Sequence, residues 1–194
     1  MTRLTELVSD ARRERIEALD ARVDDLFARL RGNRIADRVF YSASALGDFG
    51  LLWLALGLIR ILRGRPGDTR AGLRAIAATG IESVAVNIGL KSLFKRRRPR
   101  PMDAHPLPFR QPLTSSFPSG HATAAFCAAT LLAEGEKRAP VYYLLATVVA
   151  LSRIYTKIHH ASDVAGGIAI GIVLGQLARR IVPLHRAITG GPGA

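Results

Sequence analysis

The sequence predicts an all-α integral membrane protein, a helical bundle of about five transmembrane helices preceded by an amphipathic N-terminal helix. Two observations predict this fold class. Hydrophobic residues make up 48% of the 194 residues, although the chain also carries 28 Lys and Arg residues. The apolar and the basic residues are segregated into separate blocks, a pattern typical of membrane spans joined by charged loops.

The apolar segments that would form the bundle lie at residues 45–62, 72–90, 119–134, 139–157 and 161–182. A transmembrane helix needs about 20 residues, because each residue adds about 1.5 Å to its length. Segment 119–134 is short for an uninterrupted span. The longest joint, 91–118, is rich in Arg and Pro and has no helical pattern. A joint of that length in a compact protein is usually functional.

Residues 3–31 carry apolar side chains at three-to-four spacing, with Arg and acidic residues between them, which predicts an amphipathic helix that ends near Gly32 and Asn33. This helix has too many charges to cross lipid. We expect it to lie on the membrane surface, to pair with a second copy in a homodimer, or to dock on the bundle with a solvated face. The chain then divides into the N-terminal segment 1–44, a membrane domain 45–185 and a short flexible tail 186–194.

The formal net charge of +13 at pH 7 suits either nucleic acid or an anionic lipid as a partner. No separate polar domain remains to carry a nucleic-acid face, so we expect no nucleic-acid partner and instead a membrane with an anionic lipid substrate. Cys127 is the only cysteine and lies in an apolar run, which excludes an intrachain disulfide.

Charged residues at or within apolar runs are costly in lipid and are therefore functional candidates. If successive segments cross the membrane in alternate directions, the end of 72–90, the start of 119–134, the end of 139–157 and the start of 161–182 share one face. This alternation predicts that six residues converge there: Lys91, Arg98, His121, Arg153, His159 and Asp163. The neighbouring basic residues are expected to face solvent or lipid headgroups; they are Lys95, Arg96, Arg97 and Arg100.

Three of these candidates and two residues beside His121 suit a bound phosphate. The cations Lys91, Arg98 and Arg153 match a tetrahedral anion, and Arg can contact it with two donors at once. Ser119 and Gly120 stand at a predicted helix start, where backbone N–H groups and the helix dipole favour the same anion. These residues predict a phosphate-binding pocket.

Two histidines supply the reactive groups. His159 and Asp163 are one helical turn apart, so the carboxylate can fix the imidazole as a nucleophile or base. His121 stands apart and can serve as a general acid. Metal binding by these three side chains is an alternative, but the three nearby cations would repel a divalent ion. The pattern therefore predicts phosphoryl transfer through an enzyme–histidine intermediate, without a metal.

Three motifs resemble those of the type 2 phosphatidic acid phosphatase family, which shares its site with vanadium-dependent haloperoxidases. The first is Lys, six residues, then Arg-Pro, at 91–99. The second is Pro-Ser-Gly-His, at 118–121. The third is Ser-Arg, five residues, His, three residues and Asp, at 152–163. Every fixed position matches, in order, and the expected helical layout extends the resemblance to about 45–182.

The resemblance implies roles for the matched residues. His159 would attack phosphorus and become phosphohistidine, Asp163 would orient it, and His121 would protonate the leaving group. The phosphoryl oxygens would be held by a phosphate-binding set, Lys91, Arg98, Ser119, Gly120 and Arg153. The resemblance implies no metal and no cofactor, and it implies inhibition by vanadate.

We expect hydrolysis of a lipid phosphomonoester or pyrophosphate, such as phosphatidate, phosphatidylglycerophosphate or a polyprenyl (pyro)phosphate. A lipid phosphotransferase uses the same residues and stays an alternative, as does a vanadate-dependent haloperoxidase, for which the chain is short and apolar. The expected location is a bacterial-type plasma membrane. Lys and Arg are abundant near both faces, so the side that carries the site stays open. Family membrane enzymes usually have six spans, whereas only two clear apolar segments precede the first motif here.

Overall fold

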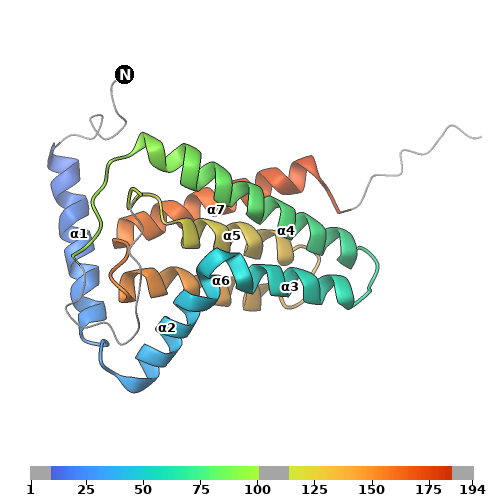
Figure 1. Ribbon diagram of the computed structural model, residues 1–194, viewed down its shortest axis with the longest axis horizontal. Coiled ribbons are helices and arrows are strands. Elements are labelled where there is room, and N and C mark those ends of the chain that lie inside the picture. Colours follow the sequence, from blue (N-terminus) through green and yellow to red (C-terminus); the bar gives the residue numbers. More distant parts are fainter. Residues whose placement is uncertain (1–9, 101–113, 185–194) are drawn as a thin grey trace, which may run out of the picture.

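The computed structural model describes residues 10–100 and 114–184. In this part of the chain all regular secondary structure is helical, and the helices form an elongated bundle with α1 lying across one end (Figure 1). The all-α fold class is therefore confirmed. The tail predicted at 186–194 lies outside the described residues.

Helix α5 (Gly120–Leu132) forms the centre of the bundle and packs against α6 (Ala139–Tyr155) and α7 (Ala161–Ile181). Nearly all of its residues are buried. Many of them are Ala, and small residues let helices approach closely in membrane proteins. The approach to α7 is tight, because a Cβ atom added to Gly167 would lie only 2.6 Å from the carbonyl oxygen of Ser119. The predicted segments 119–134, 139–157 and 161–182 are thus confirmed as helices.

The chain before the bundle centre begins with an interrupted helix. Helix α2 (Arg34–Gly47) and helix α3 (Leu51–Leu62) are joined by a 3-10 turn at Asp48–Gly50. Asn33, expected near the end of the first helix, caps the start of α2 by accepting hydrogen bonds from the backbone amides of residues 35 and 36. Residue 44 lies within α2, so the first of these two helices begins well before the predicted apolar segment 45–62.

Helix α4 (Asp68–Val84) contains most of the predicted segment 72–90. It continues through a π-helical stretch at Ala85–Gly89 and a 3-10 turn at Leu90–Leu93. Such departures from α-helical geometry occur frequently at functional sites. They end this long helix with Lys91 buried against the start of α5.

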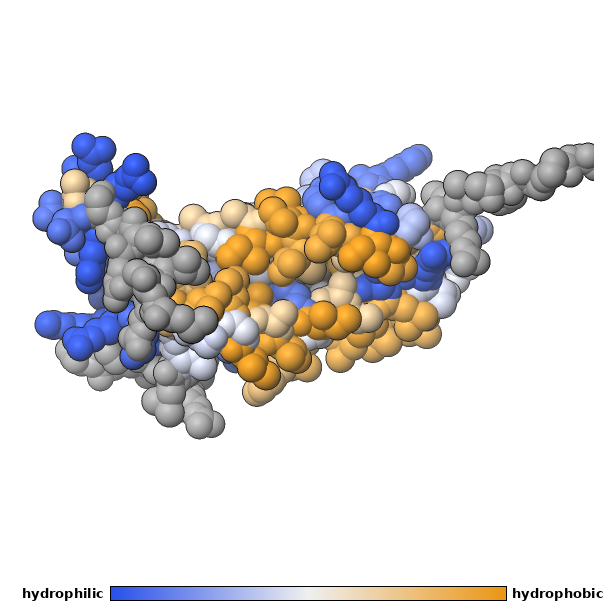
Figure 2. Space-filling view, turned by 90° about the horizontal axis from the view of Figure 1, so that it is seen from above, coloured by the Kyte–Doolittle hydropathy of each residue, from blue (hydrophilic) through white to orange (hydrophobic). Residues whose placement is uncertain are grey.

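Three helical stretches are long and apolar enough to cross a membrane: Arg34–Leu62, Asp68–Leu93 and Ala161–Ile181. Helices α5 and α6 are apolar but shorter. Apolar residues gather over the middle of the molecule, and hydrophilic residues gather at the end crossed by α1 and again towards the far end (Figure 2). This distribution suits a membrane-embedded bundle. The count of about five spans stays a prediction.

Helix α1 (Asp10–Ala28) lies within the predicted range 3–31, of which residues 3–9 fall outside the described part. It docks on α6 and α7 of its own chain. Its single buried residue is the polar Asp20, while Leu19 and Leu26 are exposed. The helix is therefore attached by the polar contact of Asp20 together with the partly buried apolar side chains of Val23 and Phe27, which pack against the core. Its pairing with a second copy in a homodimer stays a prediction.

Candidate active site

The six residues that span alternation placed on one face do come together at the end of the bundle crossed by α1. Direct contacts and short-range electrostatic interactions connect them to one another. The convergence arises because α4 ends, α5 begins, α6 ends and α7 begins at this same end. The chemical roles of the six stay predictions.

His159 lies in the short connection between α6 and α7 and is only 4% exposed. Its Nδ1 faces Asp163 Oδ2 at 3.7 Å, which is too long for a hydrogen bond. Its Nε2 accepts a hydrogen bond from Arg98 Nη1 at 3.3 Å. Burial, together with the positive charges of Arg153 and Arg98, holds the pKa of His159 well below its usual range. The imidazole is therefore neutral at pH 7, with Nε2 facing a cation and Nδ1 facing a carboxylate.

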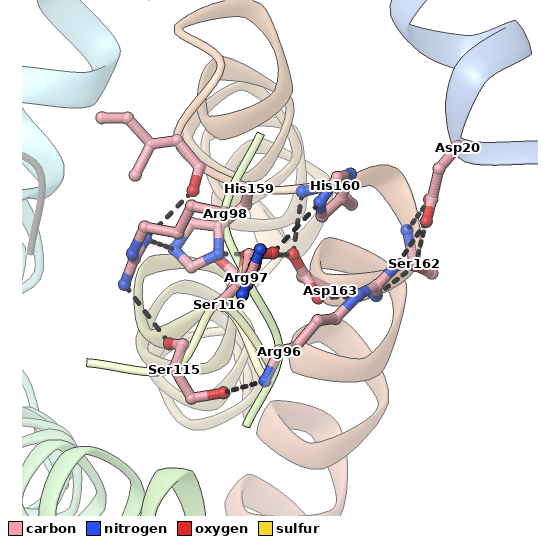
Figure 3. Close-up of polar contacts among 12 residues, drawn as sticks. Asp20, Arg96, Arg97, Arg98, Ser115, Ser116, His159, His160, Ser162 and Asp163 are labelled. Carbon is pink, nitrogen blue, oxygen red and sulfur yellow. Dashed lines mark hydrogen bonds and ion pairs between the residues drawn. The ribbon is translucent and has the colours of Figure 1, made fainter. Parts of the chain in front are cut away.

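Asp163 is fully buried and held by three donors (Figure 3). Its Oδ1 accepts from Arg96 Nη1 at 2.7 Å, and its Oδ2 accepts from Ser116 Oγ at 2.5 Å and from the backbone N–H of His160 at 2.8 Å. Donors that converge on a carboxylate stabilise its charged form and fix its orientation. Asp163 is thus an oriented anion beside His159.

Arg96 was expected to face solvent or headgroups, and that prediction is wrong. Its guanidinium bridges Asp163 to helix α1, donating to Ser162 Oγ at 2.6 Å and to Asp20 Oδ2 at 2.6 Å (Figure 3). Asp20 also accepts from the backbone N–H of Ser162 at 2.8 Å. A buried carboxylate needs a positive partner, but no sequence spacing connects Arg96 with Asp163. Arg96, Asp20 and Ser116 were therefore missed.

Two of the three predicted phosphate-binding cations are buried, and the third, Arg98, is partly buried. Lys91 is 6% exposed and Arg153 3% exposed. Lys91 Nζ donates to Asn87 Oδ1 at 2.9 Å and lies 3.5 Å from the position of a Cβ atom added to Gly120. Arg153 donates to Ser44 Oγ on α2. Arg98 donates to the backbone carbonyl oxygens of residues 158 and 115. Several of these donors are positioned by backbone or neutral partners, so their charge is left for an anion.

Ser119 was expected to offer its backbone N–H to phosphate. That N–H donates instead to the carbonyl oxygen of Asp163 at 3.1 Å. The Ser119 Oγ is buried and makes no hydrogen bond within the described part of the chain. The hydroxyl, rather than the amide, is therefore the group that Ser119 has available for a ligand.

His121 sits at the start of α5, with Nε2 2.9 Å from Asp48 Oδ1. Asp48 belongs to the break between α2 and α3. The sequence pointed to neither this aspartate nor the contact, because the two residues are 73 positions apart.

A cavity of about 500 Å³ opens beside His159. One wall is α1, with Glu17, Asp20 and Asp24, and the opposite wall is the basic segment 96–100. His159 is thus reachable from a pocket with both acidic and basic walls. Among the described residues, no group of three or more His, Cys, Asp or Glu side chains is placed to hold a metal ion.

A family model described as PAP2 superfamily matches residues 71–187, more than half of the chain. The chain belongs to the PAP2 superfamily. Its relatives include a decaprenylphosphoryl-5-phosphoribose phosphatase of Mycobacterium tuberculosis, 34% identical over 137 residues that cover 69% of this chain and 73% of that protein. A lipid A 1-phosphatase of Porphyromonas gingivalis is 44% identical over 68 residues, 32% of this chain and 15% of that protein.

Two solved structures resemble this fold. A transmembrane phosphatidylglycerolphosphate phosphatase of Bacillus subtilis superposes with a TM-score of 0.71 at 22% identity, covering 95% of this chain and 92% of the other. LpxE of Aquifex aeolicus superposes with a TM-score of 0.66 at 30% identity, covering 84% of this chain and 95% of the other. With its long apolar helices, this PAP2 chain is an integral membrane protein.

Proposed function

We propose that this PAP2 protein is a lipid phosphate phosphatase that works through a phosphohistidine at His159. The observation that carries the proposal is the pair of contacts on that imidazole. Its Nδ1 faces the oriented Asp163 carboxylate and its Nε2 faces the Arg98 guanidinium. A neutral imidazole with an oriented carboxylate at Nδ1 can attack a phosphoryl group through Nε2, where the nearby guanidinium can bind the phosphoryl oxygens.

In the first step, Nε2 of His159 forms a bond to phosphorus while the bond from phosphorus to the leaving oxygen breaks. The leaving oxygen keeps the electron pair and takes a proton from His121, which produces the free alcohol. The cationic side chains neutralise charge that spreads over the phosphoryl oxygens; they are Lys91, Arg98 and Arg153. Asp163 stabilises the positive charge that develops on the His159 ring.

In the second step, water attacks the phosphohistidine. His121 takes a proton from the water, the bond from phosphorus to Nε2 breaks, and the electron pair returns to His159. Inorganic phosphate leaves and the starting state is restored. No metal is needed in this scheme, because the three cations supply the positive charge that a metal would otherwise provide.

The substrate class we propose is a membrane lipid with a terminal phosphate. A relative that aligns with 69% of this chain is, by its name, a decaprenylphosphoryl-5-phosphoribose phosphatase. That relation favours a polyprenyl-linked phosphate first, with phosphatidate and phosphatidylglycerophosphate next. Because the site residues lie at one end of the bundle, the tail of any of these lipids can stay in the membrane while the headgroup reaches the site.

The test is phosphate release by the purified protein in detergent from a panel of these lipids, without added metal and with a chelator. We expect turnover to survive the chelator and to be inhibited by vanadate. His159→Ala should lower kcat by at least about 10³-fold. Glycerol as an added acceptor separates hydrolysis from phosphate transfer to an alcohol.

His160→Ala is the matched control, since His160 contributes its backbone N–H to Asp163 and this contact does not depend on its ring. A His159→Ala protein with a native melting profile and substantial residual turnover would contradict the nucleophile assignment. Activity that disappears with the chelator would contradict the metal-free scheme.

A further inference from the structure

The turn between α2 and α3 places the side chain of Asp48 beside His121 in the candidate active site. Asp48 has an extended backbone conformation, and the next residue, Phe49, has a φ of 53°. An L residue rarely adopts such a φ. Phe49 is 98% exposed, so contacts of its side chain with the protein do not explain this conformation. The unfavourable turn is instead associated with the placement of Asp48 beside His121.

Gly47 brings the same turn against the His121 ring. A Cβ atom added to Gly47 would lie 2.8 Å from Cδ2 of His121 and 2.9 Å from Cγ1 of Val149. The imidazole therefore rests directly on the end of α2, and only a residue without a side chain fits there. The ring is held by backbone packing on its Cδ2 edge and by the Asp48 carboxylate at Nε2.

The C-terminal end of α2 and the residue that follows it contact two residues of the site. Ser44 accepts a hydrogen bond from the buried Arg153, and Asp48, four residues later, contacts His121. His121 Nδ1 makes no hydrogen bond to any described residue. Because Nε2 is engaged by Asp48, Nδ1 is the ring nitrogen left to face a substrate.

We propose that Asp48 is a positioning residue for proton transfer: it binds the Nε2–H of His121, so that Nδ1 carries the proton for the leaving group. This inference rests on the proposed function. When the bond from phosphorus to oxygen breaks, the Nδ1 proton moves to the leaving oxygen. His121 is then neutral, with its remaining proton on Nε2 shared with Asp48. In the second step Nδ1 takes a proton from water, and Asp48 stabilises the imidazolium that forms.

A merely structural role is a poor account of this contact. The Asp48 side chain is 43% exposed and that of His121 is 21% exposed. Ion pairs this open to solvent add little to stability. A role in proton transfer predicts instead an effect that depends on how much the leaving group needs a proton.

The experiment compares kcat/KM of Asp48→Asn and wild type on two probes, phosphatidate and 4-nitrophenyl phosphate. Phosphatidate loses an alkoxide that must be protonated, whereas nitrophenolate leaves without a proton. The ratio kcat/KM reports steps up to departure of the leaving group, so slow hydrolysis of phosphohistidine does not obscure the comparison. We expect a loss of about 10- to 100-fold on phosphatidate and at most about 3-fold on 4-nitrophenyl phosphate.

Three further variants complete the design. His121→Ala should show the same selectivity between probes, and Asp48→Glu should recover part of the phosphatidate activity. Asp25→Asn, an identical change at an exposed position of α1, should match wild type on both probes. Thermal unfolding in detergent tests whether each variant is folded.

Equal losses of Asp48→Asn on both probes, or no loss on either, would overturn the role of Asp48 while leaving the proposed function intact. Wild-type activity in both His121→Ala and His159→Ala would instead overturn the proposed function. The two failures are thus distinguishable in one set of assays.

Discussion

Arg96 supplies a charge to the site that none of the three motifs contains. It lies 67 positions from Asp163 in the chain and 2.7 Å from it in space. Asp163 is fully buried, so its charge depends on this guanidinium and on the donors at its other oxygen. The residue proposed to orient His159 is therefore itself held by a side chain from the loop before α5.

Arg96→Gln should lower kcat by about 10-fold or more, because Asp163 loses the partner that fixes it beside His159. It should also lower the free energy of unfolding by about 1–3 kcal/mol, the cost of a buried acceptor left unpaired. Phosphate release and thermal unfolding measure the two effects. Lys95→Gln, an adjacent and exposed position with the same loss of charge, is the control. Unchanged kcat in Arg96→Gln would show that Asp163 needs no such partner.

Sequence reasoning found residues whose relation is local or topological. His159 and Asp163 are one helical turn apart, and Lys91, His121 and Arg153 stand at ends of apolar segments. The roles of Asp48 and Arg96 could not be predicted, because each residue meets its partner only through the packing of elements that are distant in the sequence. Fixed spacing in the sequence indicates local and topological relations, but it does not indicate contacts made by the packing of distant elements.

At the scale of elements, close packing of α7 on α5 sets the geometry of the site. A Cβ atom on Gly171 would clash with the carbonyl oxygen of Thr123 and lie 3.0 Å from the backbone N of Cys127. These are backbone atoms, which cannot turn aside as a side chain can. Asp163 is on the first turn of the same helix, so the separation of α5 and α7 also sets its distance from His121.

Gly171→Ala should therefore lower the free energy of unfolding by about 1–3 kcal/mol and reduce turnover, as α7 is pushed away from α5. Gly80→Ala on α4 is the matched control, since a Cβ atom there meets no atom within 4 Å. It should stabilise the helix by up to about 1 kcal/mol. Unfolding in detergent, followed by circular dichroism, measures both. Equal effects of the two substitutions would show that the α5–α7 contact is looser than its geometry indicates.

Helix α1 was the element whose role the sequence left open. Three alternatives followed from its pattern, and docking on its own bundle is the one that the structure supports. The docking combines the apolar packing of Val23 and Phe27 with the buried Asp20, which joins Arg96 and Ser162. The burial of one acidic residue in a charged helix cannot be predicted from the spacing of its apolar residues, because that spacing indicates only which apolar side faces the protein.

At the scale of the whole molecule, the polar chemistry is divided between the two ends of an apolar bundle (Figure 2). The end opposite the site is held by an ion-pair cluster in which Arg60 and Arg63 bind Asp68 and Glu136. This cluster joins the end of α3, the start of α4 and the connection from α5 to α6. The far end is thereby fixed by residues that take no part in the proposed chemistry.

Burial of His159 makes the stability of the whole fold depend on pH. Its pKa is lowered by folding from the usual value of 6.5, because the buried imidazole resists protonation beside Arg153 and Arg98. Its contribution to stability is therefore fully present above pH 6.5 and is lost as the pH falls below it, with a slope of up to about 1.4 kcal/mol per pH unit.

We expect the thermal unfolding midpoint of the wild type to decrease as the pH is lowered from 6.5. The midpoint of His159→Gln should depend less steeply on pH. Thermal unfolding of both proteins across this range measures the difference. Parallel curves for the two proteins would mean that His159 titrates alike in the folded and unfolded states.

The sequence by itself determined the helical membrane bundle, the motifs and the end of the bundle at which they meet, because hydropathy and span alternation require no knowledge of packing. Only the tertiary structure decided which side chains hold the reactive ones. Arg96 on Asp163, Asp48 on His121 and the docking of α1 all follow from the way α1, α2 and the segment 94–100 fold against the ends of α5, α6 and α7. The physical reason is that buried charges must find partners in space, and such partners can lie anywhere in the chain.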